Sequence, residues 1–208
     1  MAEPERPLLV GLTGSIGMGK TETARMFERL GIPVHDADAT VHRLYEPGGA
    51  AVPAIAKAFP KCIRGGRVDR DRLSEIVRAD PSAIERLEAI VHPLVAANQE
   101  AFVEKAAALG SDLVVLDVPL LFETGGEARM DAVVVVSAPA DTQRARVLAR
   151  PGMTGELLEH ILARQIPDVE KRARAHFVVE TGKGFRHAFE QVKSVVAALR
   201  TQRMKSRA

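Results

Sequence analysis

A glycine-rich segment near the start of the chain, residues 14–21, constrains the fold more than any other feature. It reads Gly-Ser-Ile-Gly-Met-Gly-Lys-Thr and comes just after the apolar residues 8–12. The spacing G-x-x-x-x-G-K-[ST] lets backbone N–H groups surround phosphate groups, while the lysine reaches the terminal phosphates and the hydroxyl binds Mg²⁺. Such a loop joins a strand to the N-terminus of a helix, so the segment predicts a nucleoside triphosphate site at that junction.

The sequence after the loop is compatible with the required helix. Residues 20–30 place Ala24, Met26, Phe27 and Leu30 where a helix packs on a sheet. We therefore expect a phosphate-binding loop rather than a glycine turn without a ligand, with Lys20 acting in catalysis. The residues expected to bind the nucleotide are Gly14, Ser15, Ile16, Gly17, Met18, Gly19, Lys20 and Thr21, and Thr21 is also an expected metal ligand.

Short apolar runs recur along the chain between longer helical patterns. They are rich in β-branched residues and do not alternate with polar ones, which is typical of strands in a sheet covered on both faces. Helical crossovers between such strands imply a parallel sheet. The sequence therefore predicts an α/β fold in three layers with a parallel five-stranded sheet, whose strands are 8–12, 32–35, 113–116, 133–136 and 177–179.

The gap between the second and third predicted strands is too long for a simple crossover. Its breaks at Pro47-Gly48-Gly49, Gly65-Gly66, Asp80-Pro81 and His92-Pro93 indicate a helical insertion rather than a loop. Asp80 is a candidate N-cap with Pro81 as the first helical residue.

A second helical departure follows the fourth predicted strand. Residues 141–150 and 154–164 form two helical patterns separated by Pro151-Gly152, and their arginines suit a mobile cover over a phosphate site. The prediction is one domain over 1–208. It comprises a core of 7–38, 111–140 and 175–206, an insertion of 39–110 and a lid of 141–174.

Composition excludes several classes of protein. Lys and Arg total 29 against 27 Asp and Glu, so the net charge of +2 gives no case for a nucleic-acid partner. The basic end, with Arg200, Arg203, Lys205 and Arg207, fits a solvated helix tail better than a binding arm. Cys62 is the single cysteine, which fits a reducing cytoplasm. No stretch approaches the roughly 18 apolar residues of a membrane span, so we expect a cytoplasmic protein without a membrane partner.

Acidic residues follow two of the predicted strands. Parallel sheets bind ligands at the carboxyl ends of their strands, so acidic residues at these positions are candidates for catalysis or ligand binding. Asp36 and Asp38 come directly after the second strand and can supply a general base together with a metal or water contact. For Asp36, capping of the following helix is an equally good reading. Asp117 ends the third strand, where a carboxylate can orient Mg²⁺, although many buried strands also end in an acid.

Three arginines of the predicted lid are candidates to clamp the transferring phosphoryl group. They are Arg144, Arg146 and Arg150, and because they are so close together we expect only one or two to reach the nucleotide. The alternative is a solvated helix face. A switch GTPase uses the same loop but needs D-x-x-G and N-K-x-D motifs, and neither stands at the expected strand ends. The pattern therefore favours a kinase.

Several short motifs follow one another from about Leu8 to Gly184. They are the loop, Asp36-Ala37-Asp38, Val68-Asp69-Arg70 with Leu73, Leu87 with Ile90-Val91-His92-Pro93, Pro119-Leu120-Leu121-Phe122-Glu123, and Gln143 with Arg146, Arg150 and Gln165. In this order they resemble the dephospho-CoA kinase family. The resemblance implies a P-loop kinase core, a helical CoA-binding insertion and a lid. It also implies transfer of the ATP γ-phosphoryl group, with Mg²⁺, to the ribose 3′-hydroxyl of dephospho-CoA.

The resemblance also implies roles for individual residues. Asp38 takes the position of the base, Arg146 is catalytic and Arg150 binds the nucleotide. The substrate-binding residues are Asp36, Asp38, Arg70, His92, Leu120 and Glu123, and the metal ligands are Thr21 and Asp117. His92 precedes a proline late in a helical pattern, so it is equally suited to satisfy a helix C-terminus.

Two other functions remain open from the sequence. One is another small-molecule P-loop kinase, such as a nucleoside monophosphate kinase, and the other is a nucleotide-binding switch protein. The insertion and the segments around His92 and Pro119 weigh against the first, and the missing D-x-x-G and N-K-x-D motifs weigh against a switch GTPase. We expect ATP and dephospho-CoA as ligands, and a monomer or weak homo-oligomer.

Overall fold

A computed structural model describes residues 6–205 of the chain. Contacts between residues divide it into two units. The core unit comprises the described residues up to His35 and those from Lys105 onward, and the insertion unit comprises Asp36–Glu104. Separate clusters of buried apolar side chains lie in the two units, so each has an interior of its own.

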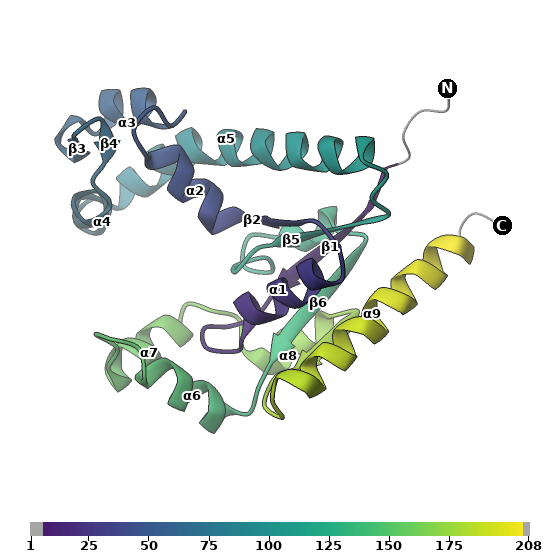
Figure 1. Ribbon diagram of the computed structural model, residues 1–208. Coiled ribbons are helices and arrows are strands. Elements are labelled where there is room, and N and C mark those ends of the chain that lie inside the picture. Colours follow the sequence, from purple (N-terminus) through teal and green to yellow (C-terminus); the bar gives the residue numbers. More distant parts are fainter. Residues whose placement is uncertain (1–5, 206–208) are drawn as a thin grey trace. The chain divides into compact units, whose positions relative to one another are not determined.

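Five strands form the main sheet in the order β2-β5-β1-β6-β7 (Figure 1). β1 pairs in parallel with β5 on one side and with β6 on the other, and β6 pairs in parallel with β7. The predicted five-stranded parallel sheet is thereby confirmed, with small shifts at the strand ends. The strands are β1 (Leu8–Thr13), β2 (Val34–Asp36), β5 (Leu113–Asp117), β6 (Ala132–Ser137) and β7 (Phe177–Glu180).

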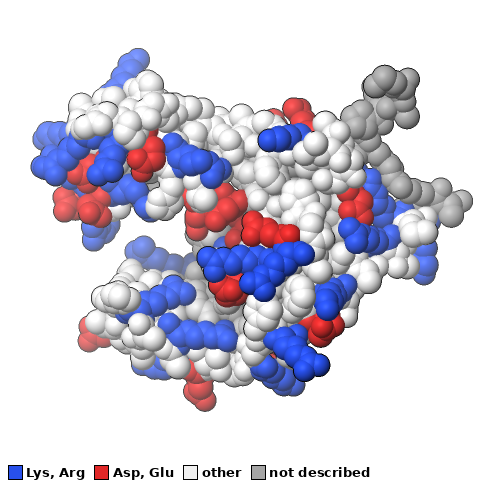
Figure 2. All heavy atoms as spheres, viewed as in Figure 1, with Lys and Arg blue, Asp and Glu red and all other residues white. Residues whose placement is uncertain are grey.

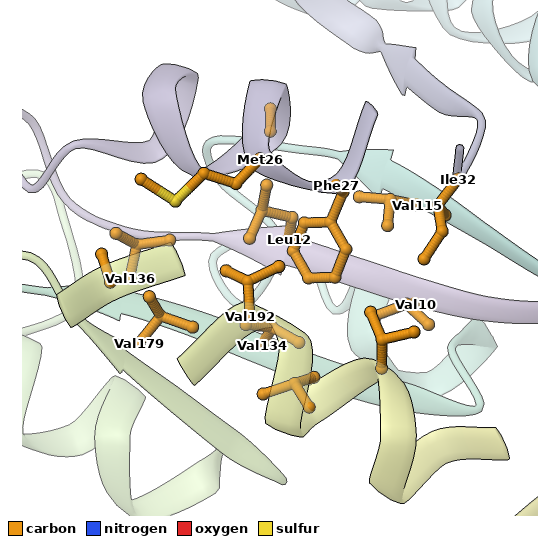
Figure 3. Close-up of a cluster of buried hydrophobic side chains, with 14 of the residues drawn as sticks. Val10, Leu12, Met26, Phe27, Ile32, Val115, Val134, Val136, Val179 and Val192 are labelled. Atoms are coloured by element: carbon orange, nitrogen blue, oxygen red, sulfur yellow. The ribbon is translucent and has the colours of Figure 1, made fainter. Parts of the chain in front are cut away.

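Two helices, α1 (Lys20–Arg29) and α9 (Phe185–Lys205), cover one face of the sheet. Figure 3 shows Phe27 of α1 and Val192 of α9 in one cluster with Val134 of β6. Val135, the next residue of β6, belongs to a different cluster, because successive residues of a strand point to opposite faces. Burial on both sides explains why β6 contains only apolar residues before Ser137.

The opposite face is covered by the segment that follows β5 and by α8 (Asp168–Arg174). Leu121 and Phe122 of that segment pack with Val133 and Val135 of β6. The segment ends in the 3-10 helix η2 (Gly126–Arg129), directly before β6. Helices, sheet and this second cover form the predicted three layers.

The two helices predicted after the fourth strand are confirmed as α6 (Ala140–Leu148) and α7 (Gly155–Leu162). The hydroxyl of Thr154 caps α7 by accepting a hydrogen bond from the N–H of Leu157 at 3.1 Å. Arg144 of α6 and Glu159 of α7 form an ion pair at 2.8 Å. Both side chains are exposed, so this pair ties the two helices together only weakly.

The insertion unit is mainly helical. Its helices pack around one buried cluster that includes Tyr45, Ile55, Phe59, Cys62 and Val91. Burial raises the pKa of the Cys62 thiol, so this cysteine is a core residue of low reactivity. The elements are α2 (Ala37–Tyr45), α3 (Val52–Ala58), η1 (Pro60–Cys62), β3 (Ile63–Arg64), β4 (Arg67–Val68), α4 (Arg70–Ala79) and α5 (Pro81–Ala108).

The insertion contains a small hairpin that the sequence prediction omitted. Ile63 pairs with Val68 and Arg64 with Arg67 in antiparallel strands. The turn residues Gly65 and Gly66 have φ values of 55° and 76°, which suit a two-residue hairpin turn and favour glycine at both positions.

The predicted break at His92-Pro93 is wrong, because α5 runs through Pro93. Proline removes one backbone hydrogen bond and crowds the preceding turn. Val91 before it and Leu94 and Val95 after it pack against the same apolar cluster. Packing on both sides of the proline therefore outweighs the lost bond. The other predicted start is confirmed: α5 begins at Pro81, and the carboxylate of Asp80 accepts from the N–H of Ser82 at 3.0 Å.

Two arginines near the C-terminus are bound to the core unit rather than solvated. Arg200 Nε donates to Asp112 Oδ2 at 2.6 Å, and Arg203 donates to the backbone carbonyl oxygen of Asp112. The hydrogen bond from Arg200 lowers the pKa of Asp112 below its ordinary value. Arg207 lies outside the described residues.

Charge is mixed over the surface. Figure 2 shows basic and acidic side chains interspersed on the face in view, in keeping with the net charge of +2. Within residues 6–205, no helix combines the length and the apolar composition needed to cross a membrane.

Candidate active site

The glycine-rich loop joins β1 to α1, as the sequence predicts. A Cβ atom on Gly14 would lie 2.6 Å from the carbonyl oxygen of Val136, so the loop backbone passes too close to β6 for a side chain. Gly17 has a φ of 78°, and a Cβ there would lie 2.5 Å from Val147 of α6. α1 starts at Lys20 without a side-chain cap, so N–H groups of its first turn and the positive end of the helix dipole are available to an anion.

Lys20 and Asp117 form the central ion pair of this site. Lys20 Nζ lies 2.5 Å from Asp117 Oδ1, and the two side chains are 17% and 5% exposed. They meet because β1 and β5 run in parallel, with Leu12 beside Asp117 in the register. The site therefore holds an ammonium and a carboxylate at the end of the sheet from which the loop emerges.

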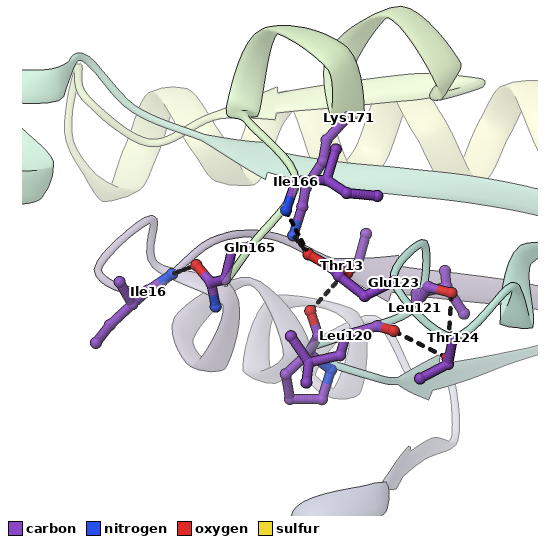
Figure 4. Close-up of polar contacts among 10 residues, drawn as sticks. Thr13, Ile16, Leu120, Leu121, Glu123, Thr124, Gln165, Ile166 and Lys171 are labelled. Atoms are coloured by element: carbon purple, nitrogen blue, oxygen red, sulfur yellow. Dashed lines mark hydrogen bonds and ion pairs between the residues drawn. The ribbon is translucent and has the colours of Figure 1, made fainter. Parts of the chain in front are cut away.

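Gln143 and Gln165 bind the loop at Ile16. Gln143 Nε2 donates to the carbonyl oxygen of Ile16 at 2.7 Å, and Gln165 Oε1 accepts from its N–H at 3.2 Å. The second of these contacts is visible in Figure 4. Gln143 lies on α6 and Gln165 follows α7, so the segment predicted as a lid holds the loop from both sides.

The three candidate arginines occupy three different environments. Arg146 is partly buried and donates to Thr181 through both terminal nitrogens, at 2.8 and 2.9 Å. Arg150 is exposed, and its guanidinium contacts no hydrogen-bonding or charged partner among the described residues. Arg144 is paired with Glu159. Arg146 is therefore held beside the loop, Arg150 is open to a ligand, and Arg144 links two lid helices.

Glu123 belongs to a buried network after β5 (Figure 4). Its Oε1 accepts from the N–H of Ile166 at 2.9 Å and lies 2.8 Å from the Nζ of Lys171, a side chain with no exposed surface. Burial alone would raise the pKa of Glu123, but the Lys171 ammonium and the Ile166 N–H outweigh burial, and the pKa is lowered. Leu120, another predicted substrate residue, is 43% exposed.

Asp36 and Asp38 differ clearly within the insertion unit. The carboxylate of Asp36 caps α2 by accepting from the N–H of Ala39 at 2.8 Å. Asp38 is exposed, and its carboxylate accepts no hydrogen bond from residues 6–205. The capping alternative for Asp36 is thus confirmed, while Asp38 keeps a free carboxylate.

The other predicted substrate residues of the insertion unit lie at its surface. Arg70 begins α4, and its Nη1 lies 3.0 Å from Nδ1 of His42. His92 is exposed on α5, next to Pro93. Because α5 continues past it, His92 does not cap a helix C-terminus, and that alternative is wrong.

Sequence reasoning missed the buried polar residues around the loop. Thr181 follows β7 and contacts Met18 and Arg146, and Ser137 donates to Asp168 at 2.7 Å. Lys171 of α8 was not among the predicted site residues, and its neighbours Glu170 and Arg172 are exposed. The available signal was a polar residue at the end of a buried strand. Thr181 stands directly after β7, just as Asp117 stands at the end of β5.

The donor groups for a metal ion are few. Among the described residues no three His, Cys, Asp or Glu side chains cluster in a way that could hold one. Asp117 offers a carboxylate that already neutralises a cation, and Thr21 an exposed hydroxyl at the start of α1. Mg²⁺ bound with nucleotide phosphates uses this kind of sparse oxygen set, so the residues fit Mg²⁺ better than a metal held by protein alone.

Comparison with known proteins gives one consistent family. A family model described as dephospho-CoA kinase matches residues 8–186. The dephospho-CoA kinase of Mesorhizobium japonicum is 53% identical over 196 residues, covering 94% of this chain and 98% of that protein. The dephospho-CoA kinase of Rhodopseudomonas palustris strain BisB18 is 54% identical over 190 residues, covering 91% and 94%.

Solved structures agree on the fold. TT1252 from Thermus thermophilus is 36% identical and superposes with a TM-score of 0.81, covering 93% of this chain and 98% of that one. Dephospho-CoA kinase from Campylobacter jejuni, at 20% identity and a TM-score of 0.64 over 94% and 98% of the two chains, shares the fold. With a family match from β1 to the start of α9, and a phosphate loop whose lysine meets a buried aspartate, the chain belongs to the dephospho-CoA kinase family.

Proposed function

We propose that this kinase transfers the γ-phosphoryl group of ATP to the ribose 3′-hydroxyl of dephospho-CoA, giving CoA and ADP. The observation that carries the proposal is the Lys20–Asp117 pair at the mouth of the loop, in a chain of this family. Both groups have the charge that ATP with a divalent cation requires. Asp117 ends β5, which pairs with β1, and Lys20 begins α1 after the loop that leaves β1.

On the donor side, the loop residues 14–21 bind the phosphates through backbone N–H groups and the first turn of α1. Lys20 leaves Asp117 and neutralises the β- and γ-phosphate oxygens. Arg146 and Arg150 bind phosphate oxygens through planar guanidinium groups, which keep their charge when water is excluded. Thr21 and Asp117 would hold Mg²⁺, which would supply further charge neutralisation on the phosphates.

On the acceptor side, Asp38 accepts the proton of the attacking hydroxyl. Its free carboxylate supports this role over Asp36, whose carboxylate caps α2. The remaining residues proposed to bind dephospho-CoA are Asp36, Arg70, His92, Leu120 and Glu123. For Glu123 the oxygen without a hydrogen-bond partner among the described residues is Oε2, which is buried, because Oε1 is taken by Lys171 and Ile166.

Phosphoryl transfer requires little covalent chemistry from the protein. The acceptor oxygen forms a bond to the γ-phosphorus while the bond to the β-γ bridging oxygen breaks, and ADP leaves. Lys20 and Arg146 stabilise charge on the transferring group, which is worth several kcal/mol of barrier in comparable sites. Asp38 removes the hydroxyl proton as the bond forms.

A coupled ADP-release assay over a panel of acceptors tests the function. ATP and Mg²⁺ are supplied with dephospho-CoA, with a nucleoside monophosphate, or with no acceptor, and the product mass is recorded. We expect ADP and CoA with dephospho-CoA alone. Turnover with the monophosphate instead would indicate a different small-molecule kinase, and nucleotide binding without any acceptor turnover would indicate a switch protein.

We further propose that the enzyme acts in the cytoplasm as a monomer or weak homo-oligomer, without nucleic-acid or membrane partners. The mixed surface charge and the single, buried cysteine support this setting. Light scattering of the purified protein over a concentration series measures the oligomeric state directly.

A further inference from the structure

Thr181, directly after β7, lies against the phosphate loop. Its hydroxyl donates to the carbonyl oxygen of Met18 at 2.6 Å, and its N–H donates to the carbonyl oxygen of Ser137 at 2.9 Å. The residue is 8% exposed, so water competes little for these bonds. A single residue thus joins the loop to the ends of β6 and β7.

The same threonine holds Arg146. Nη1 of Arg146 donates to the Thr181 hydroxyl at 2.8 Å and Nη2 to its carbonyl oxygen at 2.9 Å. Two donors on one residue fix the plane of the guanidinium as well as its position. Within residues 6–205 no carboxylate forms an ion pair with Arg146, so its charge stays available to phosphate.

Thr181 also touches the residue that precedes Lys20. A Cβ on Gly19 would lie 3.2 Å from the Thr181 hydroxyl oxygen and 3.3 Å from its methyl carbon. Gly19 has a φ of 97°, which strains any other residue. The loop therefore approaches Thr181 closely at the start of α1, where Lys20 begins the helix.

We propose that Thr181 is a positioning residue for phosphoryl transfer. Its hydroxyl donates to Met18 and accepts from Arg146, so one oxygen atom sets both the loop backbone before Lys20 and the direction of the Arg146 guanidinium. Threonine suits this task because a hydroxyl donates and accepts at once, whereas valine has the same shape and does neither. The inference rests on the proposed role of Arg146 at the γ-phosphate.

The test is a double-mutant cycle between Thr181 and Arg146. Steady-state kcat and the KM for ATP are measured for Thr181→Val, Arg146→Ala and the double variant, with melting temperatures for each. We expect Thr181→Val to lower kcat about 10- to 100-fold, as for loss of a hydrogen bond to a charged group, with a smaller change in KM. In the Arg146→Ala background the same change should cost clearly less, because only the hydrogen bond to Met18 is then lost.

Two further variants complete the experiment. Thr181→Ser keeps the hydroxyl and should retain most of the wild-type kcat. Thr201→Val is the matched control, because Thr201 is exposed on α9 and its hydroxyl, among the described residues, bonds only to the carbonyl oxygen of Ala197. If Thr181→Val does not fold, Thr181→Ala replaces it in the cycle.

The outcomes separate this inference from the proposed function. An inactive wild-type protein would contradict the proposed function itself. An active wild type with an unaffected Thr181 variant, or equal losses from Thr181→Val with and without Arg146, would overturn the positioning role. A Thr181→Ser variant as impaired as Thr181→Val would overturn it as well.

Discussion

Gln143 and Gln165 bind the two polar groups of a single loop residue, the carbonyl oxygen and the N–H of Ile16. One glutamine precedes α7 in the chain and the other follows it. Any movement of this helical pair must therefore either carry the phosphate loop along or break one of these hydrogen bonds. This direct connection makes the arginines of the segment sensitive probes of nucleotide binding.

Removal of Lys20 should abolish turnover and expose the charge of Asp117. We expect Lys20→Ala to lower kcat by at least about 10²- to 10³-fold, because a transition-state cation is lost. Loss of the ammonium beside the buried Asp117 carboxylate should also lower the unfolding free energy by about 3 kcal/mol, and Lys20→Ala/Asp117→Asn should regain much of it. Steady-state kinetics measures the change in kcat, and urea unfolding measures the change in unfolding free energy. Lys193→Ala, at an exposed lysine paired with Glu190, is the control.

The two aspartates after β2 should separate into a catalytic and a structural residue. Asp38→Asn should lower kcat about 10²- to 10⁴-fold and leave the unfolding free energy unchanged, since its carboxylate has no partner among the described residues. Asp36→Ala should cost about 1 kcal/mol of unfolding free energy through loss of the α2 cap. A larger fall in kcat for Asp36→Asn, which keeps a capping side chain, would assign the base to Asp36 instead.

Arg150 should matter for the nucleotide and Arg144 should not. Arg150→Ala is expected to raise the KM for ATP or lower kcat without a change in melting temperature, and Arg150→Lys should recover part of the loss because charge remains but the planar fork is gone. Arg144→Ala removes an exposed ion pair and should change the unfolding free energy by about 0.5 kcal/mol at most. Steady-state kinetics of the three variants decide the matter, and indistinguishable values for Arg150→Ala and Arg144→Ala would exclude a nucleotide contact.

The Glu123–Lys171 pair should make stability fall in acid. The pKa of Glu123 is lowered in the folded state, so the pair stabilises the fold above the ordinary pKa of glutamate, and this contribution disappears as the pH falls through the folded-state value. Glu123→Gln should cost about 3 kcal/mol near neutral pH, and the difference from wild type should shrink toward pH ~3. Urea unfolding across this range tests the sign. Glu156→Gln, at an exposed glutamate of α7, should show no such trend.

The proline inside α5 should limit the stability of the insertion unit. Pro93→Ala restores a backbone donor in the helix interior and should raise the unfolding free energy by about 1–2 kcal/mol. Pro53→Ala is the matched control, because Pro53 lies in the first turn of α3, where proline costs little. Thermal unfolding compares the two. A gain at both positions would point to a general effect of removing proline.

Local patterns in the sequence were enough to predict much of the core unit. Continuous apolar runs such as 133–136 identify buried strands, and the spacing of glycine and lysine in 14–21 identifies the loop between β1 and α1. The pair Gly65-Gly66 also carried a hairpin signal, although it suggested only a break. These features could be predicted because each depends on residues that are close together in the sequence.

Contacts between distant segments could not be predicted in the same way. Lys171 is fully buried because Glu123 lies beside it, and η2, β6, α6 and α7 stand between these two residues in the sequence. Thr181 contacts Met18 across most of the core unit's chain. The continuity of α5 through Pro93 likewise depends on side chains packed from other elements. In each case the energy comes from tertiary packing, which local patterns do not encode.

The pairing of Lys20 with Asp117 links the binding of the nucleotide to the binding of a divalent cation. A nucleotide that draws Lys20 away removes an ammonium from beside a buried carboxylate. Asp117 can exchange the ammonium for a divalent cation that arrives with the nucleotide, while Lys20 exchanges the carboxylate for phosphate oxygens. By thermodynamic reciprocity, each ligand then tightens the other. We therefore expect nucleotide and divalent cation together to bind more tightly than either binds alone, so selection of the charged donor would begin before any bond is made or broken.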